Sequence, residues 1–326
     1  MSNTYKLMCG AVLVWGLLAV AIARAEPPKA EPAQDEAAAE EKKPKREPIY
    51  EEEPNGEELI AAALKEARLE GKHVLVEWGG NWCGWCYKLH DVFHNDKLVA
   101  PIVAEEYQLV LVDSNTNREL MEHYGGKDTR FAYPHLTVLD ADGKVLTNQE
   151  TGSLEIGPKH DPEKVASFLK EWRPAPVDAE QALTAALERA GSEDKRVLVH
   201  VGNPYCGWCK VLTRFLHDHE DVLARDYVDL KIDTLRMPHG DEVAARLRPA
   251  GSSGVPWMVI LDARGEVLAT SVGPEGNCGY PVAPAEVEHF LSMLAGTKQR
   301  LTAEHLAEIR ADLDAFREER ERKKAG

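Results

Sequence analysis

Apolar and polar residues follow one another along the chain in patterns typical of amphipathic helices and buried strands. Between Leu59 and Ala67, apolar residues recur three and four positions apart, which predicts a helix that Asn55 caps and Gly71 ends. A continuous apolar run then predicts a buried strand over 73–78. The later patterns of the first half predict a helix after residue 86, a strand over 107–112, a β-hairpin with strands at 136–139 and 145–146, and a closing helix over 165–172.

The second half of the chain repeats this order of patterns. Asp178 is expected to cap a helix that Gly191 ends, and a buried strand over 197–201 follows it. The remaining patterns predict a strand over 227–232, a β-hairpin with strands at 258–261 and 267–268, and a helix over 287–294. Strands that alternate with helices predict an α/β fold, and the repeated order predicts two copies of one unit.

A last amphipathic helix is predicted from about Thr302. Its apolar stripe contains Leu306, Ile309, Leu313 and Phe316. Such a stripe needs a partner surface, which is either the helix's own domain or another chain.

The beginning of the chain has a different pattern. Residues 1–25 combine Lys6, a short apolar run and the small residues Ala23 and Ala25, which is typical of an export signal peptide. The alternative is an uncleaved membrane anchor, although the apolar run is shorter than the ~20 residues that a span needs. Residues 26–55 are rich in Glu, Ala, Lys and Pro, so we expect a disordered tether, either a functional spacer or an inert segment.

Length and charge narrow the picture further. A chain of 326 residues suits two domains of about 100 to 150 residues each, which we place at 56–174 and 175–298, with the last helix in 299–326. The formal net charge of −16 disfavours nucleic acids and anionic membrane surfaces as partners, because both bind basic patches. No membrane contact is expected beyond an uncleaved signal anchor.

A Cys-Gly-Trp-Cys sequence follows the predicted buried strand in each half, as Cys83 to Cys86 and Cys206 to Cys209. Two cysteines three positions apart on a first helical turn can close a disulfide. The helix N-terminus favours a thiolate on the first cysteine, whereas the second lies deeper and keeps its proton. We therefore predict that Cys83 and Cys206 attack a partner disulfide and that Cys86 and Cys209 resolve the mixed disulfide.

Two other roles for these cysteines were weighed. A structural disulfide is disfavoured because a loop this short constrains little chain entropy. A zinc site would need the two pairs to face each other, and the flanking sequences lack short ligand loops. His90 and His94 lie on one helical stripe with Cys86, but histidines at such spacing are more often solvated or packed than ligating. We expect no metal, and no cofactor other than the redox-active disulfides.

These motifs together resemble the thioredoxin family. A Val-Leu-Val strand precedes Trp82 or Tyr205, which stands directly before Cys-Gly-Trp-Cys, and a proline later precedes the β-hairpin. The pattern is most similar to the exported thioredoxin-like domains of bacterial thiol–disulfide exchange proteins, over residues ~56–172 and ~178–296. The resemblance implies two tandem thioredoxin folds, each a central mixed β-sheet flanked by helices, plus the C-terminal helix.

The family's cis-proline corresponds to Pro134 after Tyr133 and to Pro256 after Val255. The resemblance implies that each proline faces its dithiol. It also implies that backbone groups of the preceding residue pair with an extended substrate, and that the proline keeps metals off the thiolates.

The family's buried acid, six positions before the first cysteine, corresponds to Glu77 in the first half and to His200 in the second. A buried carboxylate there can take the proton of the resolving thiol, directly or through water. A charged histidine would also stabilise a thiolate, so we expect the two dithiols to differ in reduction potential.

Aromatic residues flank both dithiols. Trp82 and Tyr205 contact substrate, pack on the shoulder of the site, or do both. Trp85 and Trp208, between the cysteines, are further candidates for substrate contact. They bring no positive charge to the attacking sulfur, which favours a reductase-like or isomerase-like role over that of a strong oxidant.

The sequence therefore predicts an exported thiol–disulfide oxidoreductase, periplasmic or otherwise extracytoplasmic, that acts on cysteine-containing polypeptides or on a redox partner protein. A version of this hypothesis makes the two dithiols successive relay stations. The alternative is a redox-poor thioredoxin-fold scaffold that binds an extracytoplasmic partner. Of the other cysteines, Cys9 would leave with the signal, and Cys278 is a third redox thiol, the site of an intermolecular disulfide, or an idle exposed thiol.

Overall fold

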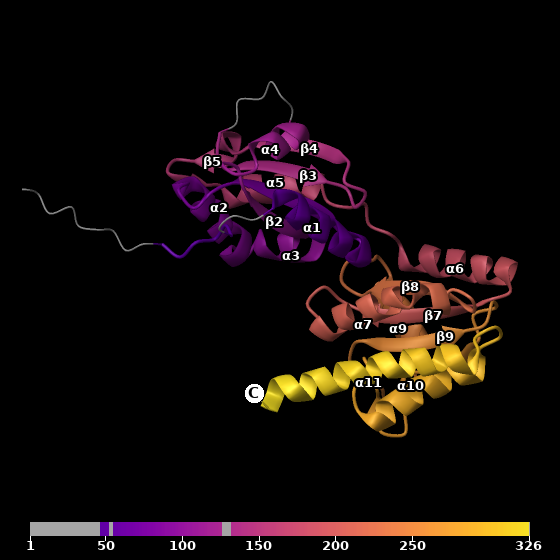
Figure 1. Ribbon diagram of the computed structural model, residues 1–326. Coiled ribbons are helices and arrows are strands. Elements are labelled where there is room, and N and C mark those ends of the chain that lie inside the picture. The colour runs from indigo at the N-terminus through magenta and orange to yellow at the C-terminus, as the bar shows by residue number, and fades with distance from the viewer. Residues whose placement is uncertain (1–45, 52–54, 126–131, 326) are drawn as a thin grey trace, which may run out of the picture. The chain divides into compact units, whose positions relative to one another are not determined.

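Two four-stranded mixed β-sheets, each with helices on both faces, organise the chain in the computed structural model (Figure 1). The structure describes residues 46–51, 55–125 and 132–325. The predicted signal peptide, Cys9 and most of the predicted tether lie outside these residues.

The helices and strands keep the order that the sequence patterns predict. The first half contains α1 Gly56–Glu70, β1 His73–Gly79, α2 Gly84–Asn95, α3 Ala100–Glu106, β2 Tyr107–Asp113, α4 Arg118–Gly125, β3 His135–Leu139, β4 Val145–Glu150, the 3-10 turn η1 Thr151–Leu154, β5 Glu155–Ile156, β6 Lys159–His160 and α5 Pro162–Glu171. The second half contains α6 Ala179–Glu193, β7 Arg196–Gly202, α7 Gly207–Asp218, α8 Glu220–Leu223, β8 Tyr227–Asp233, α9 Gly240–Leu247, β9 Trp257–Leu261, β10 Val267–Thr270, β11 Val272–Gly273, β12 Gly276–Asn277, α10 Pro284–Thr297 and α11 Ala303–Ala325.

The two sheets have the same topology. The first has the order β2-β1-β3-β4, and the second, read in the same direction, has the order β8-β7-β9-β10. In each sheet the first two strands along the chain pair in parallel, because helices connect them, and the hairpin strands are antiparallel. The predicted fold class, a mixed sheet flanked by helices in each half plus a C-terminal helix, is confirmed.

Alternate residues of the central strand face opposite helical layers. In β1, Val74, Val76 and Trp78 join the cluster formed with α1 and α4, whereas Leu75 joins the cluster formed with α2, α3 and α5. The two-residue period places Glu77 on the same face as Leu75, the face that α2 covers. The strand thus carries a carboxylate into an otherwise apolar layer next to the first Cys-Gly-Trp-Cys sequence.

The second sheet is covered in the same way, with one addition. Helices α6 and α9 pack on the face of Val197, Val199 and Val201, and α7 and α10 pack on the face of Leu198. Helix α11 lies alongside α10 (Figure 1), and its residues Ile309 and Leu313 are fully buried. The sequence analysis weighed two partners for the apolar stripe of the last helix, its own domain and another chain. The structure shows that the stripe packs against its own domain.

Helix boundaries agree with the predictions at some positions and differ at others. Asn55 accepts a hydrogen bond from the Glu57 backbone N–H, and Gly71 ends α1 in the left-handed conformation with φ of 64°. Gly191 does not end α6, which continues to Glu193 and stops at the left-handed Asp194. The sequence analysis also missed four further helices, α3, α4, α8 and α9, which are only four to eight residues long. None of the helices within the described ranges is both long and apolar enough to span a bilayer.

The last part of the predicted tether is ordered. Tyr50 is 1% exposed and packs beside the first Cys-Gly-Trp-Cys sequence, together with Ile49. The assignment of residues 26–55 to a disordered tether is therefore wrong for these two residues. They are large apolar side chains in a segment that is otherwise charged and rich in small residues, and the first half of the chain offers them a buried site.

Candidate active site: two disulfides at helix N-termini

Each Cys-Gly-Trp-Cys sequence forms a closed disulfide at the N-terminus of a helix. Cys83 is joined to Cys86 at the start of α2, and Cys206 is joined to Cys209 at the start of α7, with Cα–Cα distances of 5.3 and 5.2 Å. Cys83 and Cys206 are the N-cap residues, in extended conformation. We call the first pair the first dithiol and the second pair the second dithiol.

The first cysteine of each pair replaces the usual polar capping side chain. The Cys86 backbone N–H donates to Cys83 Sγ at 3.1 Å, and the Cys209 backbone N–H donates to Cys206 Sγ at 3.1 Å. An amide donor and the positive end of the helix dipole both stabilise negative charge on that sulfur. On reduction, the N-cap cysteine is therefore the one that this geometry favours as thiolate, as the sequence analysis predicts.

The two dithiols differ in exposure. Cys86 is fully buried, and Cys83 is only 5% exposed. Cys209 is also buried, whereas Cys206 is half-buried and its neighbour Tyr205 is exposed. The predicted depth of the resolving cysteines is present in both halves, but the predicted access to the attacking sulfur is seen at the second dithiol and not at the first.

A glycine at the end of each central strand lets the backbone approach the resolving cysteine. A Cβ at Gly202 would lie 2.8 Å from Cys209 Cβ and 2.9 Å from Cys209 Sγ. A Cβ at Gly79 would overlap both Cys86 Sγ and the Tyr50 hydroxyl oxygen. The strand, the resolving sulfur and, in the first half only, a tyrosine hydroxyl thus converge at one point.

Both predicted cis-prolines are present. The Tyr133–Pro134 and Val255–Pro256 peptide bonds are cis, and both prolines are buried. Tyr133 packs against the cluster of Tyr50, Cys83 and Cys86, so this loop borders the first dithiol. Val255 packs with the apolar cluster of the second sheet.

Polar side chains that the sequence analysis did not single out hold the cis-proline carbonyls. The Thr151 hydroxyl donates to the Pro134 carbonyl oxygen, and the Asn277 amide donates to the Pro256 carbonyl oxygen at 2.9 Å. Both donors follow the hairpin of their half, where the chain returns to the proline. The sequence cannot predict such a contact from residue spacing, because the contact depends on the path that the loop takes in the folded protein.

Glu77 is fully buried, as predicted, and its Oε1 accepts a hydrogen bond from the Tyr50 hydroxyl at 3.0 Å. Burial raises the pKa of Glu77 to about 8, although the hydrogen bond from Tyr50 opposes this rise by favouring the carboxylate. Burial, and next the negative charge of Glu77, raise the pKa of Tyr50 well above its usual value. Tyr50 thus remains a neutral hydroxyl, which can donate one hydrogen bond and accept others.

Residues 47–51, which we call the strap, are fastened beside the first dithiol by two side chains. Asn81 accepts from the backbone N–H groups of Ile49 and Tyr50 at 2.9 and 3.0 Å and donates to the Tyr50 carbonyl at 2.9 Å. The Tyr87 hydroxyl donates to the Glu47 carbonyl at 3.0 Å. The strap was missed from sequence, where only the isolated Ile49-Tyr50 pair marks it.

His200 occupies the position in β7 that Glu77 occupies in β1, and it is also buried. Its Nε2 lies 3.3 Å from the Asp229 carboxylate on the neighbouring strand β8. The second half therefore has an imidazole paired with a carboxylate where the first half has a carboxylate paired with a tyrosine.

The flanking aromatic residues have different surroundings in the two halves. Trp82 is 53% exposed and meets Tyr133 edge to face, with ring centroids 5.2 Å apart. Trp85 packs against His160, and Lys88 Nζ lies over the Trp85 ring, 3.9 Å from its centroid.

Near the second dithiol, Tyr205 is also exposed. Trp208 stacks on Tyr280 with a centroid distance of 5.9 Å, and α11 supplies Phe316 and Arg320 to the same aromatic group. The last helix thus adds side chains to the rim of the second site.

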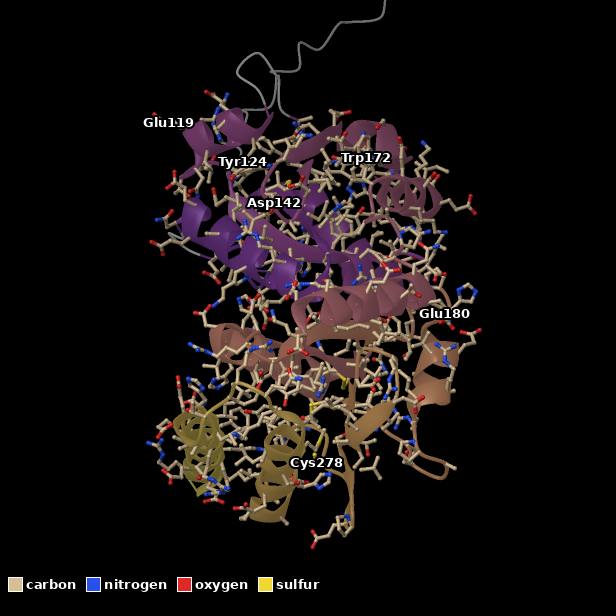
Figure 2. The ribbon with its side chains drawn as sticks, turned by 90° about the vertical axis from the view of Figure 1, so that its right-hand side faces the viewer. Glu119, Tyr124, Asp142, Trp172, Glu180 and Cys278 are labelled. Atoms are coloured by element: carbon tan, nitrogen blue, oxygen red, sulfur yellow. A yellow bond between two sulfur atoms is a disulfide. The ribbon has the colours of Figure 1, made fainter. Side chains whose placement is uncertain are left out.

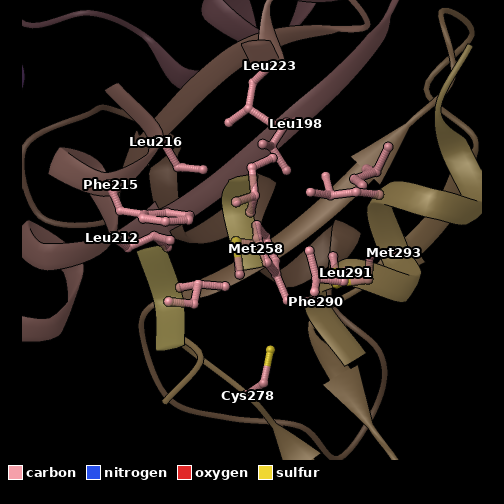
Figure 3. Close-up of a cluster of buried hydrophobic side chains, with 14 of the residues drawn as sticks. Leu198, Leu212, Phe215, Leu216, Leu223, Met258, Cys278, Phe290, Leu291 and Met293 are labelled. Carbon is pink, nitrogen blue, oxygen red and sulfur yellow. The ribbon is translucent and has the colours of Figure 1, made fainter. Parts of the chain in front are cut away.

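Cys278 is buried rather than exposed, so the expectation of an idle exposed thiol is wrong. Figure 2 marks it in the second half of the chain, and in Figure 3 its sulfur is turned toward the apolar cluster that includes Met258 and Phe290. Burial raises the pKa of its thiol to about 12, which disfavours the thiolate that redox exchange requires. Within the described residues, no group of three or more His, Cys, Asp and Glu side chains is placed to hold a metal ion.

Comparison with known proteins agrees with this geometry. Residues 57–141, which contain α1, β1, the first dithiol and β3, match the family model described as thioredoxin-like. This part of the chain is a thioredoxin-like domain. Residues 161–310, which contain the second dithiol, match a second model, named for thioredoxin and DsbH and described as a protein of unknown function, DUF255.

Two curated relatives of this chain are named as protein disulfide-isomerases. The chain is 27% identical over 250 residues to protein disulfide-isomerase erp38 of Neurospora crassa, covering 74% of this chain and 62% of that protein. It is 26% identical over 196 residues to protein disulfide-isomerase tigA of Aspergillus niger, covering 57% of this chain and 50% of that protein. The matches thus span only half to three-fifths of these relatives' lengths.

Among solved structures, a disulphide isomerase from Xylella fastidiosa Temecula1 is 25% identical, with a TM-score of 0.34 over 38% of this chain and 95% of that one. The family match and the curated relatives show a thioredoxin-like fold related to protein disulfide-isomerases. The chain also carries two cysteine pairs close enough for disulfides.

Proposed function

We propose that this protein is an exported thiol–disulfide oxidoreductase that uses both dithiols, in a reductase-like or isomerase-like role. The observation that carries the proposal is the N-cap position of Cys83 and Cys206, whose sulfurs each accept the backbone N–H of the resolving cysteine. A capping sulfur at a helix N-terminus is favoured as thiolate, and the thiolate is the attacking species in disulfide exchange.

The reaction at either dithiol proceeds in two exchange steps. The thiolate of Cys83 or Cys206 attacks one sulfur of a substrate disulfide, forms a mixed disulfide and releases the other substrate sulfur as a thiolate that takes a proton. The resolving cysteine, Cys86 or Cys209, then loses its proton and attacks the N-cap sulfur. This second step closes the protein disulfide and releases the second substrate thiol, so the substrate gains the two electrons that the dithiol loses.

Substrates in this proposal are cysteine-containing polypeptides or a redox partner protein. Exposed Trp82 and Tyr205, each directly before an N-cap cysteine, offer apolar surface to such a chain. The Gly-Trp dipeptide between the cysteines brings no positive charge to the N-cap sulfur, which supports a reductase-like or isomerase-like role over a strongly oxidising one. No cofactor beyond the disulfides is proposed, and a protein dithiol of the same compartment would regenerate the reduced form.

An extracytoplasmic location is part of the proposal, and it rests on the signal-like pattern of residues 1–25. N-terminal mass analysis of the protein from fractionated cells tests it. A mature chain beginning at Glu26 in the extracytoplasmic fraction is expected, and an unprocessed chain in the cytoplasmic fraction would contradict it.

Insulin reduction in the presence of a small dithiol tests the activity. The double variant Cys83→Ala with Cys206→Ala is expected to lose turnover, because neither site can form the mixed disulfide. Cys278→Ala is the matched control, since burial disfavours the thiolate of this cysteine, and it should retain turnover. The competing hypothesis is a binding scaffold, and it predicts that the double variant turns over insulin no differently from the parent protein.

A further inference from the structure

The buried layer next to the first dithiol contains a group that the two-step exchange described above does not use. The Tyr50 hydroxyl reaches Glu77 from the strap, 27 positions away in sequence, and both side chains are at most 1% exposed. The same hydroxyl oxygen and Cys86 Sγ both meet the space directly above Gly79. The Tyr50 hydroxyl thus donates to the buried carboxylate and borders the same space as the resolving sulfur.

Cys86 has to lose a proton in order to attack the mixed disulfide, and its burial keeps that proton from bulk solvent. Glu77 is a buried base on the face of the first sheet that α2 covers, and its Oε2 has no hydrogen-bond partner among the residues that the structure describes. A neutral hydroxyl can accept a proton on one side while it donates its own on the other. The three groups therefore supply the donor, the carrier and the acceptor that the step needs.

We propose that Tyr50 relays the proton of Cys86 to Glu77 when the first dithiol resolves a mixed disulfide. This inference rests on the proposed exchange activity and adds a residue to it. In the step, the Cys86 thiol gives its proton to Tyr50 Oη while the Tyr50 proton passes to the Glu77 carboxylate. The Cys86 thiolate forms the Cys83–Cys86 bond, the bond from Cys83 to the substrate sulfur breaks, and that sulfur takes a proton from solvent.

The second dithiol provides an internal contrast. Gly202 brings β7 against Cys209 just as Gly79 brings β1 against Cys86, but the atoms nearest to Gly202 belong to Cys209 alone. The buried residue at the Glu77 position is His200, which is paired with Asp229 on β8. The relay is therefore a property of the first dithiol, and the strap supplies it.

The pH dependence follows from the groups around Glu77. Only the carboxylate form accepts the proton, so resolution by the parent protein should accelerate as pH rises toward about 8, the pKa to which burial raises Glu77. Removal of the Tyr50 hydroxyl removes a hydrogen bond that favours the carboxylate, so the midpoint should move to higher pH. The other titratable groups near the relay are Asp113 at the end of β2, Tyr87 on α2 and Tyr133 before the cis-proline.

A two-phase release assay separates attack from resolution. The full chain is prepared with its other four cysteines, Cys9, Cys206, Cys209 and Cys278, changed to alanine, so that only the first dithiol reports. The reduced protein is mixed with 5,5′-dithiobis(2-nitrobenzoate), which releases one coloured thiolate when Cys83 attacks and a second when Cys86 resolves.

Tyr50→Phe keeps the ring and removes the hydroxyl. We expect the first phase to stay within about twofold, the second phase to slow about 100-fold at neutral pH, and its pH midpoint to rise. Glu77→Gln should slow the second phase similarly. The double variant should be no slower than either single variant, because each single substitution already disables the relay and the second has nothing further to remove.

Tyr87→Phe is the matched control, because it removes another hydroxyl that holds the strap, the one that donates to the Glu47 carbonyl. A purely structural role for Tyr50 predicts that Tyr50→Phe and Tyr87→Phe change both phases alike, with no shift in pH midpoint, and that result would overturn the relay. An unchanged second phase in Tyr50→Phe overturns it as well. If the parent protein itself releases no thiolate, the exchange activity of this dithiol is what fails, and the relay fails with it.

Discussion

Cys83 and Cys206 share one local geometry and differ in what surrounds them. Both sulfurs cap a helix and accept a backbone N–H at 3.1 Å. A buried carboxylate stands near the first pair, and a buried imidazole holds the matching position near the second. At the scale of single residues, the backbone therefore defines the chemistry, and the buried neighbour adjusts it.

The buried carboxylate makes the stability of the protein depend on pH. The pKa of Glu77 is about 8 in the fold, against an ordinary value of 4.5. A raised pKa in the folded state means that stability is fully present below about pH 4.5 and is lost as pH rises through about 8. The loss is on the order of 1.4 kcal/mol for each pH unit in that window. Urea unfolding of the oxidised protein between pH 5 and pH 9 should show this decline, and Glu77→Gln should flatten it.

Substitution of either close-approach glycine should destabilise the fold. Gly79→Ala and Gly202→Ala place a methyl group against the resolving cysteine, which should cost about 1 to 3 kcal/mol in urea unfolding. Gly207→Ala is the control, because nothing lies within 4 Å of the added methyl group. Equal stability of all three variants would contradict the packing described here.

The site residues that sequence could predict are those with a fixed offset from the cysteines. Glu77, Pro134 and Pro256 follow from the resemblance to thioredoxin, and the structure places all three as expected in buried positions. Tyr50 has no such offset, since it lies 27 positions before Glu77, on the far side of α1 in the sequence. Its side chain is informative only once the tertiary fold brings the strap back to the dithiol.

Two elements outside the repeated sheets, the strap and α11, shape the surroundings of the dithiols. Asn81 accepts two hydrogen bonds from the strap and donates one to it, and α11 extends the aromatic group around Trp208. The strap packs beside the first dithiol and reduces access to it, whereas α11 adds side chains to the rim of the second dithiol.

Release of the strap should expose Cys83. In Asn81→Ala, three hydrogen bonds of about 1 kcal/mol each are lost. The fraction of molecules in which the strap is released from the first dithiol should therefore rise on the order of 100-fold. Alkylation of reduced Cys83, followed by mass spectrometry, measures the change. Asn203→Ala, in the loop before the second dithiol, is the control and should leave Cys83 labelling unchanged. Unaltered labelling in Asn81→Ala would show that the strap does not limit access.

Helix α11 should be necessary for the stability of the second half. Leu313→Ala removes a fully buried side chain from the cluster of α10 and α11, and should lower the free energy of unfolding by about 3 kcal/mol. Glu308→Ala, at an exposed position of the same helix, should change it little. Equal urea midpoints for the two variants would contradict the docking of α11.

Element prediction succeeded where local chemistry is strong. The Asn55 cap and the Gly71 stop bound α1 as expected, and long apolar runs marked both central strands. Gly191 failed as a stop because a glycine inside a helix costs only about 1 kcal/mol, which the packing of α6 on the sheet offsets. Helices α3, α4 and α9 are too short to show a clear period, and tertiary contacts complete them.

At the scale of the whole chain, the described residues contain two copies of one topology with unequal access to their disulfides. Cys206 is half-buried, whereas the strap helps to keep Cys83 at 5% exposure. The repeated topology could be predicted from the doubled sequence pattern. The inequality could not, because the strap that packs beside the first dithiol lies outside the repeat.

Limited reduction should distinguish the two disulfides. A small dithiol added below saturation is expected to reduce Cys206–Cys209 before Cys83–Cys86, because attack needs access to a sulfur. Isotope-coded alkylation of samples quenched in acid measures both pairs in one digest. Asn81→Ala should narrow the difference in reduction rate between the two disulfides. If Cys83–Cys86 is reduced before Cys206–Cys209 in the parent protein, the prediction is contradicted.

The strap also affects how the first domain should be studied in isolation. A fragment that starts at the first residue of α1 would contain the whole sheet, the cis-proline and both cysteines, yet it would lack Tyr50. The dithiol of such a fragment would be more open and would have an unpartnered Glu77, so its rates and pH profile would describe an artificial enzyme. Fragments that begin upstream of Glu47 preserve the native environment of that disulfide.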